Sequence, residues 1–137
     1  MKKIAVISMG VKLDNEQGYS RFRYIGDFLS DAGYQVDLIT TTFQHWEKAQ
    51  RNLDEIKKEN YKFNLKFIYE PGYKKNIDLR RIRSHRIAAK NLRQLLEKEG
   101  DYDLIYCEIP PNDVALAAAE YAKSKDIPFV PDVNDLW

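Results

Sequence analysis

The sequence predicts an α/β fold in which helices cover both faces of a doubly wound parallel sheet. Five short apolar segments alternate along the chain with longer amphipathic or charged segments, and strict alternation of this kind is typical of such sheets. Several of the apolar runs are nearly continuous, as expected for parallel strands that are buried on both faces. Polar clusters follow some of these runs, at the carboxyl ends of strands where open α/β sheets bind their ligands.

The first part of the chain provides two strands and one helix. Residues 4–9 form a near-continuous apolar run, and a polar loop with two glycines follows over residues 10–20. A helix begins at about Ser20, because apolar residues then recur at three- and four-residue spacing, and Gly33 is suited to end it. The second strand spans residues 35–41.

The middle of the chain is expected to add a helix and an edge strand. Residues 42–60 begin irregularly and are expected to continue as a charged helix that carries Leu53 and Ile56. Strand three, residues 63–69, alternates apolar and polar side chains, which suits a less buried strand near the edge of the sheet.

The last part of the chain provides two helices and two strands. A long helix covers residues 78–98, and strand four covers residues 104–107. A further helix, with Asn112 and Asp113 suited to its N-cap, leads to strand five at residues 129–133, which makes a right-handed βαβ unit. The complete prediction is one Rossmann-like, three-layer αβα domain over the 137 residues, with about five strands in the order 3-2-1-4-5.

The composition is that of an ordinary globular protein. Apolar residues make up 44% and charged residues 31%, and the net charge of +1 gives no reason to expect nucleic acid as a partner. The single Cys107 excludes an internal disulfide and fits a reducing compartment. No window approaches the roughly 18 apolar residues that a membrane span needs. These observations predict a cytoplasmic protein.

Candidate binding residues occur near the first two strands. The loop that contains Gly18 leads into a helix N-terminus, where free N–H groups and the helix dipole favour phosphate; a plain surface loop is the alternative. The same dipole disfavours a cation in the first turn, so Arg21 is either a contact for an anionic ligand or a solvent-exposed side chain. His45 follows strand two and can serve sugar or phosphate oxygens, act as an acid or base, or be structural. Neither His45 nor His85 has metal-ligand neighbours at the right spacing, so no metal is expected.

Two further polar clusters follow strands four and five, from Glu108 to Asp113 and from Asp132 to Trp137. Carboxylates and amides beside an aromatic ring suit sugar recognition, because hydroxyls need acceptors and the C–H faces of a sugar pack on indole. The alternative for the second cluster is an N-cap and a hydrophobic anchor for a following helix.

The long third helix carries a basic stripe of Arg83, Arg86, Lys90 and Arg93, at three- and four-residue spacing. Such a stripe is either a solvated face or a contact with anionic lipid headgroups or a phosphate-bearing substrate. The second hypothesis predicts peripheral contact with the inner face of a membrane. The adjoining apolar face is expected to consist of Ile82, Ala89, Leu92 and Leu96.

Several segments together resemble a known family. The run IPFVPDVNDLW resembles the DxRDLWP segment of retaining GT-B glycosyltransferases of family 4, which assemble capsule, exopolysaccharide and O-antigen. GYSRFRYIGDFLSDAGYQVDLITT is similar to their opening loop, helix and strand, FQHWEKAQR to their F-x-H-x-x-K segment, and EIPPNDVALAAA to the Pro-Pro start of a helix. The similarity covers the whole chain in order. The chain departs from the family at Gln17-Gly18, where paired glycines are frequent, and at Asn134, where arginine is common.

The resemblance implies the acceptor-binding, amino-terminal domain of a two-domain hexosyltransferase-like enzyme, cut short at Trp137. The missing carboxyl-terminal domain would bind the nucleotide-sugar and carry the paired glutamates, so this chain would be inactive alone and its own catalytic residues stay unassigned. The enzyme would move a sugar to a glycan or lipid-linked acceptor with retention and without a metal or cofactor. The substrate-binding residues would be Gly18, Tyr19, Arg21, His45, Lys48, Glu108, Asn112, Asp132, Asn134, Asp135 and Trp137.

Two other functions fit the same residues. The chain is alternatively a non-catalytic acceptor-binding subunit that pairs with a separate donor-binding chain. It is otherwise a flavodoxin-like module that binds a small anion.

Overall fold

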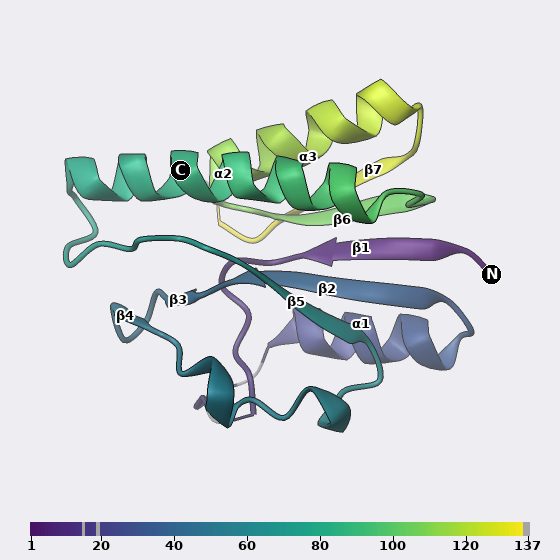
Figure 1. Ribbon diagram of the computed structural model, residues 1–137, viewed down its shortest axis with the longest axis horizontal. Coiled ribbons are helices and arrows are strands. Elements are labelled where there is room, and N and C mark those ends of the chain that lie inside the picture. The colour runs from purple at the N-terminus through teal and green to yellow at the C-terminus, as the bar shows by residue number, and fades with distance from the viewer. Residues whose placement is uncertain (15, 19, 136–137) are drawn as a thin grey trace.

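A computed structural model describes residues 1–14, 16–18 and 20–135, and a five-stranded parallel sheet forms its centre (Figure 1). The strand order β5-β2-β1-β6-β7 is the order 3-2-1-4-5 when these five are counted along the chain, so the predicted topology is confirmed. The strands are β1 (Lys3–Ile7), β2 (Gln35–Thr41), β5 (Asn64–Ile68), β6 (Leu104–Ile109) and β7 (Phe129–Val133).

Helices cover both faces of the sheet, which confirms the three-layer α/β class. Helix α1 (Arg21–Asp31) lies on one face, whereas α2 (Leu79–Glu99) and α3 (Asn112–Lys125) lie side by side on the other (Figure 1). Gly33 follows α1 with a φ of +97°, a conformation that suits glycine at the end of a helix. The predicted N-cap of α3 was one residue too late, because the extended Pro111 is the cap and Asn112 is already helical.

The central strand β1 is buried on both faces, which explains its continuous apolar sequence. Ala5 and Ile7 pack into the core beneath α2 and α3, whereas Ile4 and Val6 pack into the core beneath α1. All four side chains are buried, so neither face of this strand meets water. The edge strand β5 is less regular in its burial, as predicted from its alternating sequence.

The prediction of a helix within residues 42–60 is wrong. The chain instead forms a hairpin of β3 (Phe43–Gln44) and β4 (Ala49–Gln50), followed by two 3₁₀ turns, η1 (Leu53–Glu55) and η2 (Lys58–Asn60). Polar side chains bond the local backbone and compete with helical hydrogen bonds. Gln44 Oε1 accepts from the amides of Trp46 and Glu47, at 2.5 and 3.0 Å, and Asn52 accepts from the Asp54 amide.

The carboxyl ends of all five parallel strands lie at one edge of the sheet, the left edge in Figure 1. The β3–β4 hairpin and the amino-terminal end of α2 lie at the same edge. Among the described residues, none of the helices is both long and apolar enough to cross a membrane.

Candidate functional site

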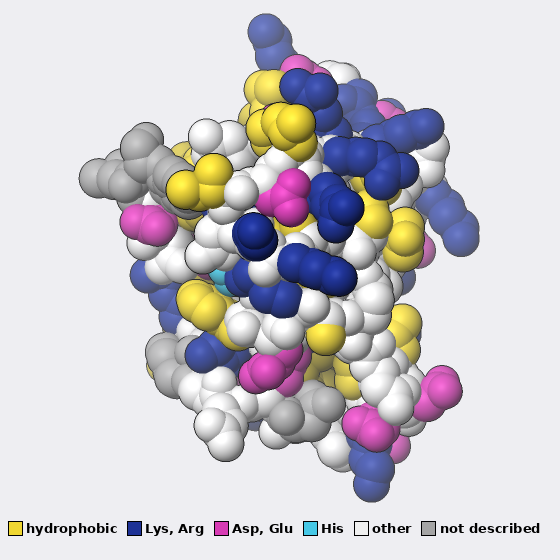
Figure 2. Space-filling model, turned by 90° about the vertical axis from the view of Figure 1, so that its left-hand side faces the viewer, with side chains coloured by type: hydrophobic (Ala, Val, Ile, Leu, Met, Phe, Trp, Pro, Cys, Tyr) yellow, Lys and Arg dark blue, Asp and Glu magenta, His cyan; other side chains and the backbone are white. Residues whose placement is uncertain are grey.

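A cavity of about 340 Å³ opens at this edge, and the segments that follow all five parallel strands contribute to its wall. Figure 2 views the molecule from this side and shows many Lys and Arg side chains over its upper part, the part nearer α2 and α3. The lining residues are Met9, Gly10, Thr41, Phe43, His45, Trp46, Glu70, Tyr73, Asn76, Arg81, His85, Glu108, Pro110, Pro111, Asn134 and Asp135.

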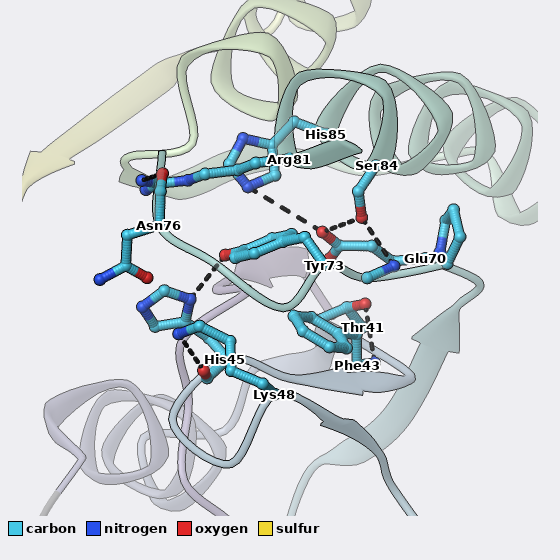
Figure 3. A network of polar contacts seen from close by, with 12 residues as sticks. Thr41, Phe43, His45, Lys48, Glu70, Tyr73, Asn76, Arg81, Ser84 and His85 are labelled. Atoms are coloured by element: carbon cyan, nitrogen blue, oxygen red, sulfur yellow. Dashed lines mark hydrogen bonds and ion pairs between the residues drawn. The ribbon is translucent and has the colours of Figure 1, made fainter. Parts of the chain in front are cut away.

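Tyr73 joins the hairpin to helix α2 at one end of the cavity (Figure 3). Its hydroxyl lies 2.5 Å from His45 Nδ1, and its ring packs edge-on against His85 with the ring centroids 5.7 Å apart. Burial raises the pKa of Tyr73 to about 12, so the phenol keeps its proton at neutral pH. The tautomer of His45 decides which group donates in this hydrogen bond, because a protonated phenol can both donate and accept.

A close approach at Gly72 fixes the position of the hairpin. Gly72 has a φ of +87°, and a Cβ atom there would collide with the Phe43 ring. The Phe43 ring packs in turn against Tyr73, with centroids 5.0 Å apart. Lys48 Nζ donates to the His45 carbonyl over 2.7 Å, which ties the tip of the hairpin together. His45 is therefore held in place by backbone, ring and side-chain contacts.

Glu70 anchors α2 behind Tyr73. Ser84 Oγ donates to Glu70 Oε2 over 2.7 Å and accepts from the Gly72 amide over 2.9 Å, and His85 Nε2 lies 3.9 Å from the same carboxyl oxygen. Burial raises the pKa of Glu70. Burial and the neighbouring Arg81 lower the pKa of His85 to about 4, so this imidazole is neutral at pH 7.

Glu108 forms the acidic end of the cavity. Its Oε1 accepts from Ser8 Oγ at 2.9 Å and from the Gly10 amide at 3.3 Å, and its Oε2 accepts from Asn134 Nδ2 at 3.0 Å. Burial raises the pKa of this carboxyl group. These bonds hold the segments after β1 and β7 to the end of β6. Asp135 is exposed and lines the same end.

Arg21 and Asp132 form an ion pair with each other, and the Tyr106 hydroxyl donates to Asp132 Oδ2 over 2.5 Å. Neither member of the pair is among the described residues that line the cavity. Asp132 therefore accounts for the cation in the first turn of α1 without an external anion. A role for these two residues in substrate binding stays a prediction.

The predicted site residues are only partly brought together. The residues that line the cavity are His45, Glu108, Asn134 and Asp135. Lys48 lies in the turn of the β3–β4 hairpin, where its Nζ donates to the His45 carbonyl. Gly18 is exposed near the Lys12 side chain, and Asn112 lines a neighbouring groove. Tyr19 and Trp137 lie outside the described residues.

Four polar side chains of the cavity wall were not among the predicted site residues: Glu70, Tyr73, Arg81 and His85. Glu70 lies two residues after the end of strand β5, so its position after a strand is a signal that could have identified it. The other three come from a loop and a helix, and only the tertiary structure brings them to the cavity. No group of three or more His, Cys, Asp or Glu in the described part of the chain is placed to hold a metal ion.

The basic stripe on α2 is narrower than predicted. Arg83, Arg86 and Lys90 are exposed, but Arg93 Nε bonds Glu97 over 3.1 Å and its charge is partly neutralised. The predicted apolar neighbours Leu92 and Leu96 are buried in the core rather than beside the stripe. The exposed apolar neighbours are Ile77, Leu79 and Ile82, which are 95%, 82% and 48% exposed.

Comparison with known proteins supports the fold alone. No protein-family profile matches the chain, and no curated protein matches it. Two crystal structures of the C-terminal domain of a Pyrococcus furiosus hydrogenase are similar, with TM-scores of 0.60 and 0.61 at 21% and 18% identity. Each alignment covers 96% of this chain, and 91% and 90% of the hydrogenase domains. At this identity, the likeness defines a class of α/β fold and carries no function.

The low pKa of His85 predicts a pH-dependent contribution to stability. Between the unfolded pKa of 6.5 and the native pKa of about 4, the unfolded chain binds more protons. Relative to a His85→Gln variant, the wild type should therefore lose stability as the pH falls through this window, by at most about 3 kcal/mol. Urea unfolding of both proteins at several pH values measures this difference, in which shared contributions from Glu70 and Glu108 largely cancel. A constant difference across the window would contradict the prediction.

Proposed function

We propose that this chain is the acceptor-binding domain of a retaining glycosyltransferase, which moves a sugar from a nucleotide-sugar to a glycan or lipid-linked acceptor. The observation that carries the proposal is the cavity at the carboxyl edge. Its wall contains His45, Glu108, Asn134 and Asp135, which lie in the segments that resemble family 4 enzymes. Open α/β sheets bind ligands at this edge.

The chemistry of the wall suits a sugar. The Asp135 carboxylate can accept hydrogen bonds from hydroxyl groups at one end of the cavity, while Glu108 is already held by three donors. Trp46 is 60% exposed at the rim, so the part of its indole that Lys12 and His45 leave uncovered can pack against sugar C–H groups. Pro110 and Pro111 add apolar surface. Small-molecule sites commonly combine such apolar walls with a few polar groups that fix orientation.

The basic stripe supports a membrane-associated acceptor. Arg83, Arg86 and Lys90 line a shallow groove on α2 together with Leu79 and Ile82. Cations beside exposed apolar side chains suit an anionic bilayer, where headgroups attract the cations and the apolar side chains enter the interface. The neighbouring groove that contains Ile77 and Leu79 shares Arg81 and His85 with the cavity, so the cavity opens beside this surface.

The acceptor proposal predicts which ligands bind to this chain. Saturation-transfer NMR with monosaccharides, methyl glycosides, hexose phosphates and nucleotide-sugars should give saturable binding of an acceptor-type sugar and only weak binding of nucleotide-sugars. His45→Ala and Asp135→Ala should each weaken sugar binding about tenfold, the cost of roughly one hydrogen bond. Asp54→Ala, an exposed carboxylate on η1, is the matched control. Tight nucleotide-sugar binding, or equal affinity in all three variants, would refute the proposal.

The membrane proposal predicts binding to anionic vesicles alone. Each cation near such a surface contributes about 1 kcal/mol, so attachment should be reversible and weakened by salt. Changing Arg83, Arg86, Lys90 and Arg93 to Gln should abolish co-sedimentation with anionic vesicles. A control variant should retain much of the co-sedimentation. It carries the same change to Gln at four exposed lysines elsewhere: Lys2, Lys57, Lys58 and Lys123. Equal losses in the two quadruple variants would show that only the overall charge matters.

A further inference from the structure

We propose that the end of the cavity around Tyr73 is a phosphate-binding subsite, formed by Arg81, His45 and His85 of the cavity wall and by Lys48 beside the Tyr73 ring. This inference rests on the proposed function and makes it more specific, because it assigns the acceptor to the class of phosphate-bearing sugars. Of the sequence features that suggested phosphate binding, only His45 belongs to this subsite, and the tertiary structure brings the other three side chains to it.

Four nitrogen-bearing side chains converge on one aromatic ring. Lys48 Nζ and Arg81 Cζ lie 5.5 and 5.6 Å from the centre of the Tyr73 ring. Figure 3 shows Lys48 and His45 approaching from the hairpin on one side of Tyr73, and Arg81 and His85 approaching from α2 on the other. The Tyr73 hydroxyl contacts His45, and the Tyr73 ring contacts His85. The two segments therefore place their basic groups around one aromatic ring.

The electrostatics of this cluster favour an anion. Burial lowers the pKa values of His45, Lys48 and His85; Arg81 adds to all three shifts, and Lys48 adds to that of His45. Groups that lower one another's pKa in this way repel one another when charged. A bound phosphate would relieve that repulsion by accepting hydrogen bonds from the ammonium and guanidinium groups, which are strong contacts for phosphate oxygens.

Arg81 also has partners within the protein. Its Nη1 donates to the Asn76 carbonyl over 2.8 Å. Glu70 accepts from Ser84 behind Tyr73, and burial raises its pKa while Arg81 acts in the opposite direction. Asp113 raises the pKa of His85 and so partly opposes the effect of Arg81. Glu108 is held by Ser8, Gly10 and Asn134 and lines the cavity with Asp135.

The unequal distribution of charge along the cavity predicts the orientation of the ligand. A phosphate is attracted by Lys48 and Arg81 and repelled by the carboxylates of Glu108 and Asp135, whereas sugar hydroxyls find acceptors at the acidic end. The phosphate should therefore lie beside Tyr73. From Arg81, the neighbouring groove runs past Ile77 and Leu79, so the phosphate can belong to a soluble sugar phosphate or to the headgroup of an apolar carrier.

The first measurement uses pyrophosphate as the probe and the imidazoles as reporters. The chain has only two histidines, His45 and His85, so nitrogen-15 NMR observes both sides of the subsite. We expect saturable shifts of both imidazoles and a rise in their pKa values, because a nearby anion favours the protonated form. Arg81→Ala should weaken pyrophosphate binding about tenfold or more, the typical cost of a charge-assisted hydrogen bond.

Controls separate the subsite from overall charge. Arg80→Ala removes the same charge from the adjacent position of α2 and should leave the affinity within about twofold of the wild type, because the Arg80 side chain is exposed and its charge is screened by solvent. Lys48→Ala, on a different element, should weaken binding as Arg81→Ala does, and tests the proposal if Arg81→Ala folds poorly. Equal effects of Arg80→Ala and Arg81→Ala together with no effect of Lys48→Ala would overturn the subsite, as would the absence of saturable shifts.

Three further probes, hexose 1-phosphate, methyl hexoside and octyl phosphate, distinguish the sources of the phosphate. They also test the phosphate subsite separately from the acceptor function. Hexose 1-phosphate binding more tightly than pyrophosphate and methyl hexoside supports both the subsite and the acceptor function. Methyl hexoside binding without any response to pyrophosphate overturns the subsite and retains the sugar site. Arg81-dependent pyrophosphate binding with no gain from the hexose retains the subsite and overturns the acceptor function. Octyl phosphate binding more tightly than hexose 1-phosphate supports the subsite and assigns the phosphate to an apolar carrier.

Discussion

The parallel alignment of the five strands is the constraint on which the other features of this protein depend. Strand β1 pairs in parallel with β2 and β6, and Ile7 lies opposite both Ile39 and Cys107, so these strands run in the same direction and β1 ends two residues before its two neighbours. The segments that follow the strands must then meet at one edge of the sheet. The cavity, its acidic end at Glu108 and the hairpin that carries His45 all result from this shared direction.

Within that edge, the polar groups are divided between two rigid supports. Glu108 is held by the segments after β1 and β7, whereas Tyr73 is held between the hairpin and α2, with Phe43 packed against both Tyr73 and Gly72. The two ends of the cavity consequently differ in charge, with Glu108 and Asp135 at one end and the basic groups, beside the buried Glu70, at the other. This polarity favours a ligand that carries hydroxyls and a phosphate on opposite sides, and the sugar phosphate that we propose has this form.

Features that depend on a local sequence pattern were predicted correctly, whereas features that depend on contacts between distant residues were not. The strands and their order follow from apolar runs, and His45 and Glu108 were identified because each follows a strand. The hairpin replaced a predicted helix because side chains such as Gln44 bond the local backbone. Arg21 was expected either to contact an anionic ligand or to be exposed to solvent, but it pairs with Asp132 of β7, 111 residues away. Such pairings follow from the topology of the fold, which short-range sequence patterns do not reveal.

A crystal structure of the protein with hexose 1-phosphate would test the central claim most directly, because it locates both ends of the ligand. The account predicts a phosphate within hydrogen-bond distance of Arg81 and Lys48, with the sugar hydroxyls directed toward Glu108 and Asp135. A phosphate bound instead at the loop that contains Gly18, or a sugar at the phosphate end of the cavity, would contradict it.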